Sequence, residues 1–225
     1  MGASVPVARR NILADRRRLA TSVLGVGAAV ALILLLQGLW GGFRVQISAY
    51  EDNVGADLFV GEAGTRNFFG VPSVVRLEAV STIRAIPGVD GADPVAVRFA
   101  VLDLHGLKQS IFLVGSVPQR TGGPWDVVAG RAVGRDDEVV VDRSLADQHG
   151  IGLGDRIEVM GEPFRVVGLS AGTRSWMAGF AFTSHVAIER LLSMPGTTSF
   201  VLVRTPEPAA VAEAIRDRTG LTVLT

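Results

Sequence analysis

The residue types that usually carry catalysis, metal binding or nucleotide binding occur in this chain without the spacing that those functions need. The three histidines, His105, His149 and His185, are far apart, none lies in an H-E-x-x-H motif, and there is no cysteine to complete a zinc site. Lys108, the only lysine, follows Leu107, whereas a phosphate-binding P-loop places Gly before its lysine and Ser or Thr after it. Ser175 has no G-x-S-x-G motif around it. The sequence therefore predicts no enzyme, no cofactor and no metal site, and any ATP would be bound by a separate subunit.

One long segment of the chain is free of charge. Residues 19–43 read LATSVLGVGAAVALILLLQGLWGGF. A helix of that length measures about 37 Å, which exceeds the roughly 30 Å hydrocarbon core of a bilayer. The small residues Ser22, Gly25 and Ala29 share one face of this helix, where another helix could approach closely. The sequence predicts one transmembrane helix over 19–43.

The charges that flank this segment predict its orientation. Residues 1–18 carry five arginines and only one acidic residue, Asp15, so that 17 basic and 21 acidic residues remain of the 22 of each in the chain. By the positive-inside rule, the N-terminus lies in the cytoplasm and the folded mass outside it. The rest of the chain has no basic patch, which excludes a nucleic-acid footprint. A cleaved signal peptide is the alternative, but the apolar run is too long and Ile47-Ser48-Ala49 is a poor cleavage site.

Two basic or apolar stretches border the membrane segment. Residues 7–18 (VARRNILADRRR) have the pattern of a basic amphipathic helix, which could contact the membrane surface or a cytoplasmic partner. The arginines of this candidate contact are Arg9, Arg10, Arg16, Arg17 and Arg18. Beyond the membrane segment, Phe43, Ile47, Tyr50, Val54 and Leu58 recur at helical spacing, and this predicts a stalk helix over 44–56.

The remaining residues alternate between strand and helix patterns, which indicates an α+β domain. We expect a helix over 73–86, strands over 95–102 and 110–114, a strand over 138–141, a hairpin over 156–169 with its turn at Gly161-Glu162-Pro163, and a helix that Ser184 caps. Strand–helix–strand patterns occur both near residues 56–102 and over 200–224. These patterns predict two related βα units with a β-rich insertion between them.

One loop is a candidate for partner contacts. Residues 172–179 (GTRSWMAG) place Arg174, Trp176 and Met177 between glycines, and these residue types are enriched at protein interfaces. The alternative is that Trp176 packs onto the core of the domain.

The chain resembles the MacB/FtsX-like ABC permeases, specifically their N-terminal half. The resemblance lies in ARRNILADRRR before the membrane helix, in ADLFV after the stalk, and above all in residues 137–169, DEVVVDRSLADQHGIGLGDRIEVMGEPFRVVGL. It implies a bacterial cytoplasmic (inner) membrane protein with its N-terminus in the cytoplasm and a periplasmic or extracytoplasmic domain. It also implies several partners: an ATP-binding ABC subunit, a second permease copy in a homo- or heterodimer, membrane lipid and an extracytoplasmic adaptor protein.

The resemblance also implies a division of the chain. Residues 1–18 would be cytoplasmic, 19–43 transmembrane and 44–56 the stalk; 57–116 and 197–225 would form a porter-like subdomain, and 117–196 an inserted, β-rich, sabre-like subdomain. The function implied is that of a permease component of an exporter or mechanotransmission complex, in which a partner ATPase moves the outer domain. Members of the group have three more membrane helices after this domain. The alternative function is a single-pass, membrane-tethered binding or scaffold module without an ATPase.

Overall fold

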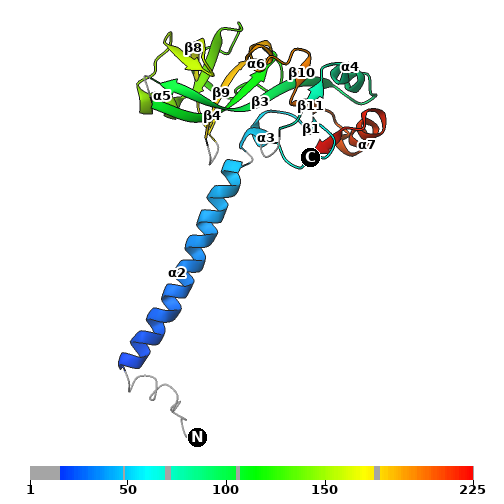
Figure 1. Ribbon diagram of the computed structural model, residues 1–225. Coiled ribbons are helices and arrows are strands. Elements are labelled where there is room, and N and C mark those ends of the chain that lie inside the picture. Colours follow the sequence, from blue (N-terminus) through cyan, green and yellow to red (C-terminus); the bar gives the residue numbers. More distant parts are fainter. Residues whose placement is uncertain (1–15, 48, 69–71, 105–106, 175–177, 225) are drawn as a thin grey trace. The chain divides into compact units, whose positions relative to one another are not determined.

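The computed structural model describes residues 16–47, 49–68, 72–104, 107–174 and 178–224 (Figure 1). These residues form two compact units, residues 1–46 and residues 47–225. Each unit is described here by itself.

The first unit is one long helix, α2 (Arg16–Ile47). Its stretch Ala20–Gly41 has a mean hydropathy of 2.2, and no part of this stretch is buried within the protein. A helix that is apolar on all sides and covered by no other protein element suits a lipid environment. Its 22 residues measure about 33 Å at 1.5 Å per residue, enough to cross a bilayer.

The second unit includes a short helix, α3 (Ala49–Asn53), whose Tyr50 belongs to the core of the folded domain. Tyr50 is fully buried and Val54 is 8% exposed. The helical spacing of Tyr50 and Val54 thus also serves packing against the domain. The predicted stalk over 44–56 stays a prediction.

A single sheet of ten strands forms the centre of the second unit. Its order is β12-β1-β11-β3-β4-β9-β6-β8-β5, and β7 pairs with both β3 and β8. The strands are β1 (Leu58–Gly61), β3 (Gly91–Leu104), β4 (Leu107–Ser116), β5 (Val127–Gly130), β6 (Glu138–Asp142), β7 (Arg156–Val159), β8 (Glu162–Ser170), β9 (Gly179–Ser184), β11 (Phe200–Arg204) and β12 (Thr222–Leu224). A separate pair joins β2 (Val75–Arg76) to β10 (Thr197–Thr198).

Two strand–helix–strand units interlock at one end of the sheet. The first is β1, α4 (Glu78–Arg84) and β3; the second is β11, α7 (Pro208–Thr219) and β12. Strand β1 lies between β11 and β12 and is antiparallel to both, while β11 lies antiparallel between β1 and β3. This is the order of a split βαβ, ferredoxin-like arrangement. The prediction of two βα units is confirmed.

The rest of the sheet continues from β4 without a break. Strand β9 pairs with β4 in parallel, β6 pairs antiparallel with β9, and β6 pairs in parallel with β8. Helices α5 (Arg143–His149) and α6 (His185–Leu192) belong to this part, and Figure 1 shows α5 and β8 at the end of the sheet opposite to α4 and α7. The division into 57–116 plus 197–225 and 117–196 stays a prediction, because one sheet runs through both.

The sheet has two differently built faces. On one face, helices α4 and α7 pack over β1, β11 and β12, and helices α5 and α6 pack over β3, β4, β6 and β9. On the other face lies a cluster rich in rings, which we call the aromatic face. It consists of Tyr50, Val54, Phe59, Phe68, Val95, Phe112, Val114, Val140, Ala178, Phe180, Phe182, Phe200 and Leu202.

The hairpin predicted over 156–169 is confirmed, because β7 and β8 pair antiparallel around Met160 and Gly161, which both have positive φ. The helix predicted over 73–86 is shorter. Val75 pairs with Thr198 in β2 and β10, which holds the chain extended there, and the helix then starts at Glu78. Strand β5 was not predicted; it is short, and a register shift interrupts its pairing with β8.

Candidate functional site

The segment that follows the long helix is anchored in the domain through Tyr50. Its hydroxyl donates a hydrogen bond to the carbonyl oxygen of Gly122 at 2.9 Å. Its ring stacks on Phe68 with centroids 5.1 Å apart, and it lies edge-on to Trp125 at 6.1 Å and tilted to Phe180 at 5.8 Å. Complete burial raises the pKa of the phenol far above its ordinary value, because the charged phenolate would lose its hydration.

Tyr50 therefore connects three separate stretches of the domain to α3. Phe68 belongs to the connection after β1, Trp125 to the connection before β5, and Phe180 to β9 in the middle of the sheet. Offset and edge-on ring pairs each contribute about 0.5–1.5 kcal/mol beyond their buried area.

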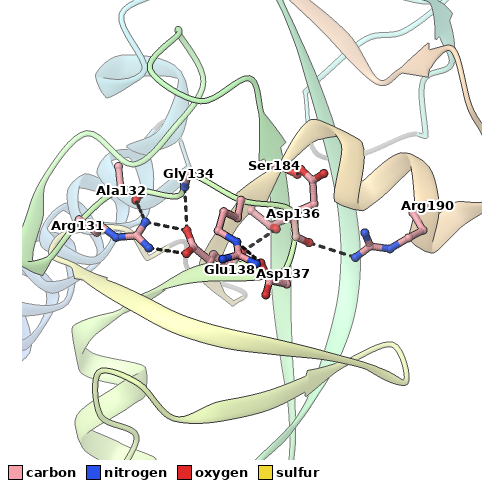
Figure 2. A network of polar contacts seen from close by, with 10 residues as sticks. Arg131, Ala132, Gly134, Asp136, Asp137, Glu138, Ser184 and Arg190 are labelled. Atoms are coloured by element: carbon pink, nitrogen blue, oxygen red, sulfur yellow. Dashed lines mark hydrogen bonds and ion pairs between the residues drawn. The ribbon is translucent and has the colours of Figure 1, made fainter.

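A second group of polar contacts lies at the start of β6 (Figure 2). The Arg131 guanidinium binds both carboxylate oxygens of Glu138, the longer contact measuring 2.7 Å, and Gly134 donates its backbone N–H to the same carboxylate at 3.0 Å. Glu138 is 4% exposed. The hydrogen bond from Arg131 lowers the pKa of Glu138 to about 2, with Gly134 acting in the same direction and against burial.

The loop before β6, which carries Asp136, also contacts helix α6. The Ser184 hydroxyl caps α6 by accepting from Ala187 N at 3.0 Å, and it donates to Asp136 Oδ1 at 2.5 Å. Arg190, in the last turn of α6, donates to the carbonyl oxygen of Asp136 at 3.1 Å (Figure 2). The predicted cap at Ser184 is confirmed. These contacts join the loop before β6 to both ends of α6.

A third group of contacts organises the loop that carries Arg174. Asp142 caps α5 by accepting from Ser144 N at 2.9 Å, and its other carboxylate oxygen accepts from the hydroxyl of Thr173 at 2.8 Å. Asp142 and Thr173 are both buried. Arg174 is exposed, with its guanidinium 3.4 Å from the hydroxyl of Ser144. The buried part of the loop thus holds Arg174 at the surface.

The sequence of this chain matches a known protein family. The model of the MacB-like periplasmic core domain matches residues 19–219, which is most of the chain. The chain belongs to this family. Uncharacterized ABC transporter permease Rv2563 of Mycobacterium tuberculosis is 32% identical over 163 residues, covering 72% of this chain and 45% of the relative. Uncharacterized ABC transporter permease Rv0072 of the same species is 26% identical over 218 residues, covering 95% of this chain and 60% of the relative. The chain thus spans about half the length of these relatives.

Solved structures show the same fold. The periplasmic region of MacB from Actinobacillus actinomycetemcomitans superposes with a TM-score of 0.58 at 14% identity, covering 77% of this chain and 91% of that one. The extracellular domain of the noncanonic ABC-type transporter YknZ from Gram-positive bacteria gives 0.56 at 16% identity, covering 75% and 98%. The MacB-like core domain thus corresponds to the second unit described above, and the predicted family and fold class are confirmed.

The site residues predicted for this MacB-like chain are only partly described. Arg9, Arg10, Trp176 and Met177 lie outside the described residues. Arg16, Arg17 and Arg18 form the first turn of α2, and of their side chains only that of Arg17 is described, as exposed. Arg174 is exposed, and its role as a contact residue stays a prediction.

Among the described residues of the MacB-like domain, no group of three or more His, Asp or Glu side chains is arranged to hold a metal ion. His185 is buried, with Nδ1 3.8 Å from Glu189, and its pKa is lowered because desolvation outweighs the pull of that carboxylate. His105 lies outside the described residues.

The sequence did not single out Tyr50 as an anchor. Its spacing from Val54 indicated that both residues lie on the apolar face of a helix, but helical spacing does not determine which part of the protein packs on that face. The signal that could have identified the anchor is that Tyr50 is the only tyrosine in the chain and lies seven residues after the predicted membrane segment 19–43.

Proposed function

We propose that this chain is the membrane-anchored N-terminal part of an ABC-type permease, in which a partner ATPase moves the extracytoplasmic domain during export or mechanotransmission. The observation that carries the proposal is the anchoring of the segment directly after α2 in the domain core through Tyr50. A displacement of the membrane helix would act on the sheet through this anchored segment. The family of the chain and the permease names of its relatives support the same function.

The proposed arrangement places the N-terminus in the cytoplasm and the MacB-like domain outside it. The arginines at positions 9, 10, 16, 17 and 18 would stay on the cytoplasmic side and contact the ATPase or the headgroups of the inner leaflet. ATP would be bound by the partner, since the single lysine has no P-loop sequence around it. A second permease copy would complete the complex.

Affinity purification from the native host tests the ATPase contact. The full gene product, tagged at its C-terminus, is purified in mild detergent, and its partners are identified by mass spectrometry. We expect a P-loop ATPase in the wild-type sample, and a large loss of it when the five N-terminal arginines are replaced by glutamine. The control replaces five exposed arginines of the outer domain instead: Arg66, Arg76, Arg143, Arg156 and Arg218.

The outcomes separate the candidate functions. Equal recovery of the ATPase with both sets of substitutions would contradict the proposed contact at the N-terminal arginines. A wild-type sample without any P-loop ATPase would contradict the coupling function and favour a single-pass scaffold module.

A further inference from the structure

Strand β3 has an open edge in the interior of the sheet. On one side, β3 pairs with β4 from Val95 to Leu104. On the other side, β11 pairs with β3 only as far as Val95, and β7 pairs with it only from Leu102 onward. Within the part of the chain that the structure describes, no strand pairs with this side of residues 96–101. We call this stretch the open edge of β3.

The backbone of Phe99 points into the open edge. Where β11 ends, Ser199 donates its backbone N–H to the Val95 carbonyl oxygen at 3.1 Å, and Val97 donates its backbone N–H to Ser199 Oγ at 2.9 Å. The backbone groups of alternate residues in a strand point to the same side, so the N–H and C=O of Phe99 point the same way as those of Val97. A free donor and acceptor on a strand form a template for another extended chain.

Exposed apolar side chains surround the open edge. Phe99 is 51% exposed and Val101 is 43% exposed. Both share the aromatic face with Val95, because alternate residues of a strand lie on one face. Met160 is 46% exposed and begins the turn after β7, at the other end of the open edge. Aromatic and methionine side chains are enriched in protein interfaces, so this composition favours a protein partner.

Arg98 lies on the opposite face of β3 and has no partner of its own. Its side chain is half-buried, and its Nε is buried without a hydrogen bond. No ion pair among the described residues includes it. It lines a pocket between β3, β10 and α6. Glu189 lines the same pocket, but its Oε1 accepts from Gly196 N at 2.7 Å and its Oε2 lies 3.8 Å from His185 Nδ1. The buried guanidinium therefore favours an acidic group from a partner.

The open edge is short and closed at both ends. Ser199 lies beside Val97 at one end, and the β7–β8 turn lies beside Val101 at the other. The space between them measures about four residues, or roughly 13 Å at 3.3 Å per residue. The long sheet edge of a second copy cannot lie flat in so short a space, whereas a single extended segment of three or four residues can.

From these observations we infer that the open edge of β3 binds a short extended segment of another protein, in which an acidic residue lies between two apolar ones. The backbone of this segment pairs with Phe99. Its acidic side chain binds Arg98 on one face, and its apolar side chains contact Phe99 and Val101 on the other. Strand addition of this kind takes its affinity from main-chain hydrogen bonds and its specificity from alternate side chains. The inference concerns the folded domain alone and does not rest on coupling to an ATPase.

Binding of defined peptides to the full-length protein in detergent tests the inference. The probe is fluorescein-labelled Thr-Ile-Glu-Val-Thr with blocked termini, and its Kd is measured by fluorescence anisotropy. Two further peptides carry either Gln in place of Glu or N-methyl groups on the Ile and Val nitrogens, which block strand pairing. The protein variants are Arg98→Gln and, as the matched control, Arg156→Gln, which removes an exposed arginine of β7.

We expect the wild type to bind the Glu peptide about tenfold more tightly than the Gln peptide, because a hydrogen bond to a charged group is lost. Arg156→Gln should keep this preference, and Arg98→Gln should abolish it, since the two peptides then lose the same partner. The N-methylated peptide should lose most of its binding to the wild type.

Three results would overturn the inference. Equal binding of the Glu and Gln peptides to the wild type would remove the role of Arg98. Undiminished binding of the N-methylated peptide would exclude strand pairing. A lack of saturable binding at millimolar peptide would exclude the site as a whole. If that lack of binding came with a disulfide between two copies of Val101→Cys, in a chain otherwise free of cysteine, the edge would belong to a second copy instead.

Discussion

Replacing Tyr50 by phenylalanine tests the anchor through two effects of opposite sign. The substitution keeps the ring contacts with Phe68, Trp125 and Phe180 and removes only the hydroxyl that donates to the Gly122 carbonyl. Loss of one buried hydrogen bond costs about 1–2 kcal/mol of unfolding free energy at neutral pH. Tyr50→Phe is therefore expected to be the less stable protein at pH 7.

At high pH the difference is expected to disappear. Burial raises the pKa of Tyr50 in the folded state, so its stabilising effect is complete below the unfolded-state pKa of about 10 and is lost as the pH rises above it. The wild-type protein then loses about 1.4 kcal/mol per pH unit relative to the variant, because only its unfolded state releases the phenolic proton. The stability curves of the two proteins should meet at roughly pH 11.

The measurement is urea denaturation of the full-length protein in detergent, followed by far-ultraviolet circular dichroism between pH 7 and pH 11. The chain suits it, because Tyr50 is the only tyrosine, there is one lysine and there is no cysteine, and the lysine is common to both proteins. A stability difference that stays constant across this range, or tyrosinate absorbance of the folded wild type near pH 10, would refute the assigned burial.

Three further substitutions test the polar contacts and the packing. The pKa of Glu138 is lowered, so its contribution to the free energy of unfolding is complete above its ordinary pKa and is lost as the pH falls toward 2. Glu138→Gln should therefore cost about 1–3 kcal/mol of unfolding free energy at pH 7 and flatten the acid limb of a denaturation series. An unchanged acid limb would contradict the pairing of Glu138 with Arg131. Gly168→Ala would place its Cβ in a clash with the Arg131 carbonyl oxygen, so we expect the free energy of unfolding to fall by about 1–3 kcal/mol in urea denaturation. The control, Gly152→Ala, should change it little. Equal stability of the two variants would argue against this close approach. Asp142→Ala should cost about 2 kcal/mol in the same assay, because it removes the cap of Ser144 N and the acceptor of Thr173. Asp142→Asn should recover only part of this loss, since its amide keeps one acceptor for the cap but turns a donor toward Thr173. Wild-type stability of Asp142→Ala would contradict these contacts.

Local sequence signals predicted much of the domain. Gly161 between two alternating apolar runs indicated the β7–β8 hairpin, although Glu162 and Pro163, expected in the turn, already pair in β8, and Ser184 marked the start of α6. The strand–helix–strand pattern over 200–224 agrees with α7, which begins at Pro208 and is followed by Gly220. Each of these signals depends on the backbone of a few neighbouring residues, which is why the sequence alone suffices.

Features that depend on distant partners could not be read in the same way. Val75 is extended because Thr198 lies beside it, more than a hundred residues later in the chain. The ion pair between Arg131 and Glu138 depends on how the chain turns before β6. The burial of Tyr50 depends on Gly122 and Phe180 reaching α3 from elsewhere, so its spacing predicted a helix and not its contacts.

The position of β1 in the sheet has a consequence for biogenesis. Strand β1 obtains both of its neighbours, β11 and β12, from residues 200–224, so its hydrogen bonds cannot form until that part of the polypeptide has been synthesised. On the proposed topology, nearly the entire domain must pass through the translocation channel before β1 can pair with its neighbouring strands. Such late, long-range closure slows folding, and a ribosome stalled before residue 200 would leave a tethered, open sheet for quality-control proteases at the outer surface.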